Sequence, residues 1–135
     1  PLICALGEAV RLLPPTGVAL GQVGALPRLL RQKLGEIPEV AIHSPEDALP
    51  YVLNFSAGRV RGETMLHFLA QREVYVSSGS ACGRAKPSHV LEAMGLPADQ
   101  VTSALRVSFS RFSTQEDVEA LVEGLKLGLE SLARS

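Results

Sequence analysis

The feature that most constrains the fold is the proline pair in Pro14-Pro15-Thr16-Gly17. Proline lacks a backbone N–H and restricts the residue before it, so a helix does not continue through two of them. Residues 2–13 have a helical pattern, which therefore ends at this point. Because the chain opens with Pro1 and not with methionine, we expect residues 1–13 to be the tail of a helix from a large domain that is missing, and residues 14–26 to be a linker.

Helical and strand patterns alternate along residues 27–135, which we expect to form one domain. Helices are predicted at residues 27–35 and 61–71, from Pro87 to Gly95, and after a capping box of Ser113 and Glu116. Strands are predicted at residues 40–42, 51–55, 74–76 and 105–109. This order indicates the α+β class, with a small sheet covered by helices on one side.

The composition is that of a folded globular protein and suggests no polyanionic partner. Of the 135 residues, 46% are hydrophobic and 20% are charged, unlike the composition of disordered chains. The net charge is -1, so we expect neither direct nucleic-acid binding nor attraction to an anionic membrane. The two cysteines, Cys4 and Cys82, do not make a disulfide framework, which favours a reducing cytoplasm.

Cys82 is the candidate nucleophile. It lies in Ser77-Ser78-Gly79-Ser80-Ala81-Cys82-Gly83, a run of small residues that predicts an exposed loop after a strand. A nucleophilic cysteine must be a thiolate, which positive charge and a helix N-terminus both favour. Arg84, Lys86 and the helix predicted at Pro87 supply these features. The alternative is a loop cysteine without a chemical role, and Cys4, inside an apolar helix, is predicted to be a packing residue.

Arg106 is the candidate binding residue, because it is an isolated charge in an otherwise apolar predicted strand. The planar fork of a guanidinium suits bidentate recognition of a carboxylate. The alternative is an arginine on an edge strand that points into water. The three histidines, His43, His67 and His89, are scattered and have no metal-ligand spacing with the cysteines, so no metal site is predicted.

Several ordered segments resemble the cysteine desulfurases of the class V aminotransferase family. The segment that ends in Cys82 is followed by Lys86-Pro87-Ser88-His89-Val90-Leu91-Glu92-Ala93-Met94-Gly95, as in that family. The resemblance continues in Leu105-Arg106-Val107-Ser108-Phe109-Ser110-Arg111-Phe112-Ser113-Thr114. It extends backwards through Leu49-Pro50-Tyr51-Val52-Leu53-Asn54-Phe55-Ser56 and Arg61-Gly62-Glu63, so it covers most of residues 37–132.

The resemblance implies a fold, an activity and two site residues. The fold is a mainly antiparallel sheet covered by helices, as in the small domain of fold-type I enzymes that use pyridoxal phosphate. The activity is removal of sulfur from L-cysteine, which leaves alanine and a persulfide on a mobile-loop cysteine that matches Cys82. Arg106 is implied to bind the carboxylate of the substrate. The sulfur then passes to an acceptor or scaffold protein, for iron-sulfur cluster assembly or tRNA thiolation.

The chain also departs from the family. The lysine that binds pyridoxal phosphate belongs to a preceding large domain, and Lys33, Lys86 and Lys126 do not have its sequence context. We therefore expect no pyridoxal phosphate on this chain and no activity from it alone. The loop from Cys82 to Ser88 is shorter than in many members. Two alternatives stay open, namely a non-catalytic domain that receives sulfur or binds a partner, and another class V aminotransferase or a selenocysteine lyase.

Without the large domain, the apolar residues of the segment 2–13 are expected to be exposed. Exposed apolar surface of this kind promotes association. We therefore expect a homodimer or a larger self-associated form, assembled through this helix.

Overall fold

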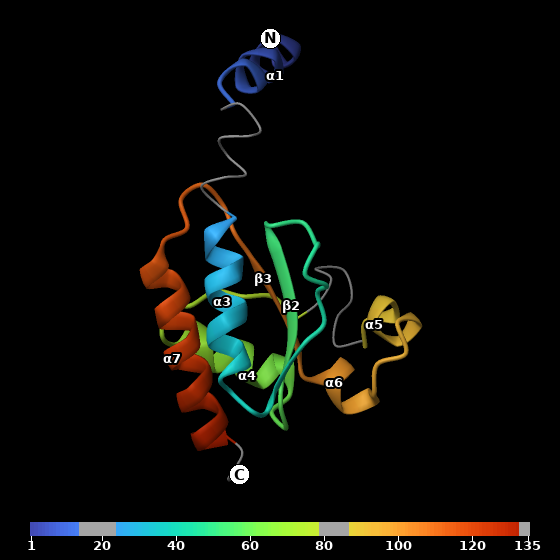
Figure 1. Cartoon of the computed structure of the whole chain (residues 1–135). Coiled ribbons are helices and arrows are strands. Elements are labelled where there is room, and N and C mark those ends of the chain that lie inside the picture. The colour runs from blue at the N-terminus through green and yellow to red at the C-terminus, as the bar shows by residue number, and fades with distance from the viewer. Residues whose placement is uncertain (14–23, 79–86, 133–135) are drawn as a thin grey trace.

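The computed structural model describes residues 1–13, 24–78 and 87–132 (Figure 1); Cys82 and residues 14–23 of the predicted linker lie outside these ranges. In chain order the elements are α1 (Leu2–Arg11), α3 (Ala25–Gly35), β1 (Val40–Ile42), β2 (Val52–Ala57), α4 (Gly62–Ala70), α5 (His89–Ala93), α6 (Ala98–Thr102), β3 (Ala104–Ser108) and α7 (Gln115–Leu132). The predicted α+β class is confirmed.

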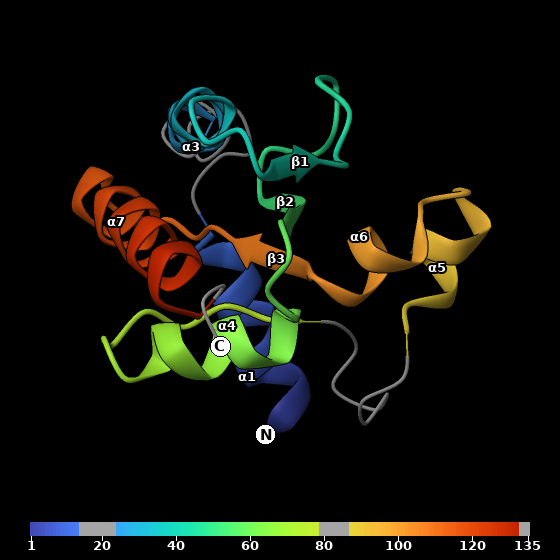
Figure 2. The same ribbon diagram turned by 90° about the horizontal axis from the view of Figure 1, so that it is seen from below.

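The three strands form one antiparallel sheet in the order β1-β2-β3. Phe55 of β2 lies opposite both Ile42 of β1 and Leu105 of β3, which fixes the register across the sheet. Helices α3, α4 and α7 pack on one face, here called the inner face, whereas α5 and α6 lie on the other side of the sheet (Figure 2).

The inner face holds the main core. Leu53 and Phe55 of β2 and Leu105 and Val107 of β3 alternate with residues of the opposite face, as side chains of a strand must, and all four are buried. The helices contribute buried apolar residues to the same cluster, namely Leu30, Leu34, Met65, Leu69, Leu121 and Leu125. This single cluster explains why the alternation in both strands was readable from the sequence.

Helices α4 and α7 approach closely because two glycines of α7 face α4. A Cβ atom at Gly124 would lie 2.7 Å from Leu69 Cδ2, and one at Gly128 would lie 2.5 Å from Met65 Sδ. Real Cβ atoms do not come this near to their neighbours, so a larger residue at either position would require the Leu69 or Met65 side chain, or a helix, to shift. The two large side chains of α4 therefore fill the space that the glycines leave.

Several predicted boundaries are wrong by one or two residues. Helix α5 starts at His89 and not at Pro87, because Ser88 is its N-cap and its Oγ accepts from Leu91 N at 3.5 Å. The capping box of α7 consists of Thr114 and Asp117, since Thr114 N donates to Asp117 Oδ2 at 2.9 Å and Asp117 N to Thr114 Oγ1 at 3.3 Å. The predicted Ser113 instead accepts from Ser110 N through its Oγ.

The strand predicted at residues 74–76 is absent, although the next residue does join the sheet. Ser77 forms an isolated antiparallel bridge with Arg106 of β3. Just before it, Glu73 has a positive φ of 61° and Val74 N donates to Leu69 O at 3.1 Å. Because this hydrogen bond ties Val74 to the end of α4, pairing with β3 begins only later in the segment.

Helix α1 contributes nothing to the core. All of its side chains are exposed, including the large apolar ones of Leu2, Ile3, Leu6 and Val10. The ion pair that the structure describes on this helix, between Arg11 and Glu8, also lies on the surface. The apolar stripe of α1 is therefore uncovered in the described part of the chain.

Candidate functional site

The candidate site lies on the face of the sheet opposite α3 and α7, here called the outer face. Val52, Asn54 and Ser56 of β2 project there, opposite Ser108, Arg106 and Ala104 of β3. One end of this face is covered, because Ala104 packs with Val101 and Leu91 of α6 and α5 in a small second cluster. The other end, with Val52, Arg106 and Ser108, is exposed.

Arg106 lies in the exposed part of the outer face, next to the segment that continues towards Cys82. Its backbone N donates to Ser77 O at 2.6 Å, and Ser77 N donates to Arg106 O at 3.0 Å. Its Nη2 lies 3.5 Å from Ser77 Oγ. Within the described ranges no carboxylate forms an ion pair with Arg106. In the described part of the chain the Arg106 side chain is therefore exposed and not neutralised by an acid, whereas Cys82 lies outside the described residues.

A histidine that the sequence did not single out contributes to the covered end of the outer face. His43 Nε2 forms a short hydrogen bond with Ser56 Oγ, and Ser56 Oγ donates to Gln100 O at 2.6 Å. Because the single hydroxyl proton of Ser56 goes to a carbonyl, His43 Nε2 must be the donor. Burial lowers the pKa of His43. The Ser56 hydroxyl is thus occupied, so this pair joins β1, β2 and α6 and does not form a nucleophile and its base.

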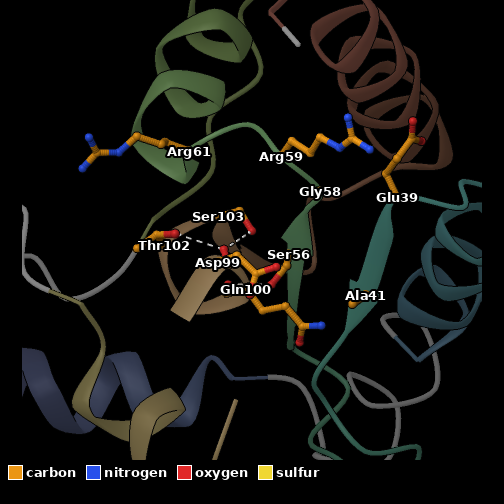
Figure 3. Close-up of a pocket in the computed structure, with 10 residues that line it drawn as sticks. All are labelled: Glu39, Ala41, Ser56, Gly58, Arg59, Arg61, Asp99, Gln100, Thr102 and Ser103. Atoms are coloured by element: carbon orange, nitrogen blue, oxygen red, sulfur yellow. Dashed lines mark hydrogen bonds between the residues drawn. The ribbon is translucent and has the colours of Figure 1, made fainter. Parts of the chain in front are cut away.

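A cavity of about 450 Å³ adjoins Ser56 between the sheet and α6. Figure 3 shows the charged side chains around it, Glu39, Arg59, Arg61 and Asp99. The guanidinium groups of Arg59 and Arg61 point away from one another, and the two acids contribute opposite charge. Thr102 Oγ1 and Ser103 Oγ both donate to the backbone oxygen of Asp99, at 3.0 Å and 2.8 Å. The groups do not converge on one ligand, so Arg106 remains the better candidate.

A family described as "Aminotransferase class-V" matches residues 1–121. The chain belongs to the class V aminotransferase family. A cysteine desulfurase IscS of Clostridium botulinum is 36% identical over 132 residues, which are 91% of this chain and 33% of that protein. A cysteine desulfurase of Pongo abelii is 38% identical over 99 residues, or 71% of this chain and 21% of that protein.

Part of a solved structure has a similar fold. A NifS-like protein from Rickettsia africae superposes with a TM-score of 0.72 at 27% identity, over 83% of this chain and 29% of that one. The chain thus spans about a third of the length of the curated relatives that it matches. The predicted family, and the match to a cysteine desulfurase over part of its length, are confirmed.

Family membership implies pyridoxal phosphate in the full-length class V enzymes. The described lysines do not fit a site for it, because Lys33 and Lys126 lie on α3 and α7, which cover the inner face, away from Arg106. Lys86 lies outside the described residues. In residues 1–13, 24–78 and 87–132, no three histidine, cysteine or acidic side chains are grouped to hold a metal ion. No helix in the same ranges is long and apolar enough to cross a membrane.

Two site features were missed at the sequence level. The run of small residues predicts only a loop at Ser77, whereas its pairing with Arg106 joins residues that are far apart in the sequence. Asn54, opposite Arg106, was passed over inside a predicted strand. Asparagine is depleted in strands, so its place in the run Val52-Leu53-Asn54-Phe55 was a usable signal.

Proposed function

We propose that this chain is the sulfur-transfer part of a cysteine desulfurase, with Cys82 as the sulfur carrier and Arg106 as the ligand of the substrate carboxylate. The observation that carries the proposal is the bridge between Arg106 and Ser77, because Ser77 begins the motif that ends in Cys82. Five residues of extended chain span at most about 17 Å. The two proposed groups are therefore tethered to one end of the outer face.

In the proposed reaction the thiolate of Cys82 attacks the sulfur of L-cysteine. A sulfur–sulfur bond forms and the carbon–sulfur bond of the substrate breaks, with its electron pair remaining on the carbon. That carbon takes a proton and the product is alanine, while Cys82 keeps the transferred sulfur as a persulfide. The transferred sulfur is oxidised and the carbon is reduced, so no outside oxidant or reductant is needed. A thiolate is the required nucleophile, and Arg84 and Lys86 near Cys82 favour it.

Arg106 holds the substrate in this proposal. Its exposed guanidinium has donors available for the two oxygens of a carboxylate, and bidentate pairs of this kind fix orientation as well as adding affinity. Pyridoxal phosphate belongs to the part of the relatives that this chain does not span, and the chain alone is expected to be inactive. The sulfur goes to an acceptor or scaffold protein in a reducing cytoplasm, for iron-sulfur cluster assembly or tRNA thiolation.

The test combines this chain with the remaining part of a class V desulfurase, L-cysteine and pyridoxal phosphate. Mass spectrometry of the chain is expected to show a gain of one sulfur atom on Cys82, and none when the second part is left out. Cys82→Ser is the control for the site. Absence of sulfur on Cys82 in the complete mixture contradicts the proposal.

Replacement of the proposed substrate ligand tests the second role. Arg106→Lys keeps the positive charge and loses the planar fork, so the KM for L-cysteine is expected to rise about tenfold or more in the same mixture. Ser108→Ala, two residues further along the exposed part of the outer face, is the matched control. An unchanged KM in Arg106→Lys removes the assignment of Arg106.

A second candidate function is a domain that only receives sulfur. The exposure of Val52, Arg106 and Ser108 at one end of the outer face favours it, because a partner could contact these residues directly. It predicts a sulfur adduct or a partner complex in the absence of the second part. A selenocysteine lyase or another class V enzyme is distinguished by replacing L-cysteine with selenocysteine or with other amino acids in the same assay.

The exposed stripe of α1 supports the proposal that the chain self-associates. Leu6 is 67% exposed and Ile3 is 87% exposed, so a second copy can cover apolar surface that is otherwise in water. Light scattering is expected to give a mass of at least two chains, and Leu6→Glu is expected to shift it to that of a monomer. A monomer at high concentration without the substitution argues against self-association.

A further inference from the structure

The side chain of Asn54 has an unsatisfied acceptor. Its backbone is fully paired, since Asn54 N donates to Ser44 Oγ at 2.9 Å and Asn54 O accepts from His43 N at 2.9 Å. Its Oδ1 is buried and has no hydrogen-bond partner among the residues that the structure describes. Buried polar atoms are nearly always paired in folded proteins, so an orphaned one calls for a functional explanation.

Strand register pairs Asn54 with a side chain that carries several donors, that of Arg106. Asn54 lies directly opposite Arg106 on the neighbouring strand. The backbone N and O of Arg106 both bond to Ser77, on the side away from β2. Asn54 and Arg106 therefore form a pair without mutual backbone hydrogen bonds. In such pairs the Cα atoms are only about 4.5 Å apart and the side chains lie close together on the same face.

The guanidinium of Arg106 has donors to spare. It carries five N–H groups, of which a bidentate carboxylate uses two. In the present arrangement Nη2 lies 3.5 Å from Ser77 Oγ, at the limit of a hydrogen bond, so the guanidinium is held weakly on that side. One weak hydrogen bond does not fix the orientation of the guanidinium, and a second one is needed to aim its N–H groups at a carboxylate.

We infer that Asn54 is a positioning residue for Arg106, in which the amide oxygen accepts one guanidinium N–H while the paired N–H groups bind a carboxylate. The assignment rests on the proposed function for the identity of the natural carboxylate, which is that of L-cysteine. It makes the pair Asn54 and Arg106, and not Arg106 alone, the element that recognises the substrate.

The experiment uses NMR of the arginine side chains in the 135-residue chain, with acetate as the carboxylate probe and chloride as the ionic-strength control. The Arg106 signal is assigned by its loss in Arg106→Lys. In the unsubstituted chain this signal is expected to move with acetate, and rotation of the guanidinium is expected to slow as acetate binds. In Asn54→Leu, which keeps the size and removes the acceptor, acetate is expected to bind about tenfold more weakly.

A second variant keeps the test decisive if Asn54→Leu does not fold. Asn54→Asp retains an acceptor and adds a charge, so it is expected to slow rotation of the Arg106 guanidinium even without acetate. Ser108→Ala, at the neighbouring outward position, is expected to change neither measurement. Equal acetate affinity in Asn54→Leu, or an Arg106 rotation unaffected by Asn54→Asp, overturns the inference.

These measurements need neither a cofactor nor sulfur chemistry, so they separate two kinds of failure. If Cys82 gains no sulfur in the complete mixture but the NMR results hold, the proposed function fails and the pairing stands. If sulfur is transferred, Asn54→Leu is expected to raise the KM for L-cysteine about tenfold with kcat unchanged. A lowered kcat at unchanged KM assigns Asn54 some other role and contradicts positioning.

Discussion

The two faces of the sheet use the same two strands for different purposes. On the inner face, Leu53, Phe55, Leu105 and Val107 are buried under three helices. On the outer face, the residues between them are polar or exposed, except where α6 covers Ser56 and Ala104. Because successive residues of a strand point to opposite sides, a single residue step separates the core from the candidate site.

Because the two faces are separate, substitutions on the outer face can alter exposed side chains without altering the stability that comes from the inner face. A truncation on the inner face leaves a cavity in the core, whereas a substitution on the exposed part of the outer face leaves the core packing unchanged. The side chain of Arg106 points to the outer face, but its chain neighbours Leu105 and Val107 are buried on the inner face and anchor β3 in the core. The candidate site therefore lies on a strand that the core anchors, next to the segment that leads to Cys82.

The largest expected effect comes from truncation on the inner face. Phe55→Ala is expected to lower the free energy of unfolding by about 3–5 kcal/mol, because it removes a fully buried ring from the core. Ser108→Ala, on the exposed part of the outer face, is expected to change it by less than about 0.5 kcal/mol. Urea denaturation of both variants measures the difference. A similar decrease in the free energy of unfolding in both variants would contradict the assignment of the core to the inner face.

A smaller effect is expected where the helices of the inner face meet. Gly128→Ala places a Cβ 2.5 Å from Met65 Sδ and 3.2 Å from Phe68 Cδ1, so the Met65 side chain or one of the two helices must shift, and the expected loss is about 1–3 kcal/mol. Gly35→Ala is the matched control, because nothing lies within 4 Å of its new Cβ. The control is expected to be neutral or slightly stabilising, since alanine favours a helix more than glycine does. A neutral Gly128→Ala in urea denaturation contradicts close packing of α4 against α7.

The inner face could be predicted from the sequence and the outer site only in part. Alternating apolar residues placed β2 and β3 to within two residues, because each strand packs against one continuous core. Arg106 stood out as a single charge within such a pattern. Ser77 and Asn54, which lie beside Arg106 in the fold, could not be predicted as its neighbours. They belong to distant segments of the sequence, and no local pattern encodes their pairing with β3.

Helix α6 shows a second limit of sequence analysis. It is five residues long and buries only Val101, so it is too short to display a helical period. It nevertheless covers one end of the outer face and supplies the carbonyl of Gln100 to Ser56. The predicted capping box failed by a single residue for a similar reason, because serine and threonine stand side by side at positions 113 and 114 and only the geometry selects Thr114.

A third prediction concerns the turn that carries the chain from the inner-face helix α4 to the edge beside Arg106. Glu73 has a φ of 61°, a left-handed conformation that costs residues with a Cβ about 1 kcal/mol or more. Glu73→Gly is therefore expected to raise the free energy of unfolding by up to about 1 kcal/mol. Glu73→Gln keeps the strained backbone and is expected to be neutral. A Glu73→Gly variant less stable than Glu73→Gln in urea denaturation contradicts the explanation.

The smallest expected effect is a pH dependence that arises on the covered end of the outer face. Burial lowers the pKa of His43 below its ordinary value of 6.5, so the folded state binds a proton at this site less readily than the unfolded chain does. Stability from this group is therefore present above pH 6.5 and is lost as the pH falls below it towards the lowered pKa. Urea denaturation at several pH values around 6.5 measures this loss.

His43→Gln separates the titration from the hydrogen bond. A glutamine amide can still donate to Ser56 Oγ but does not titrate, so this variant is expected to lose the His43 part of the pH dependence while keeping β1, β2 and α6 joined. His67 and His89 are exposed and are left unchanged in this variant. An identical pH profile in His43→Gln and the unsubstituted chain shows that burial at the covered end is too slight to matter. The contacts of α6 at the covered end would then have no measurable effect on the protonation of His43.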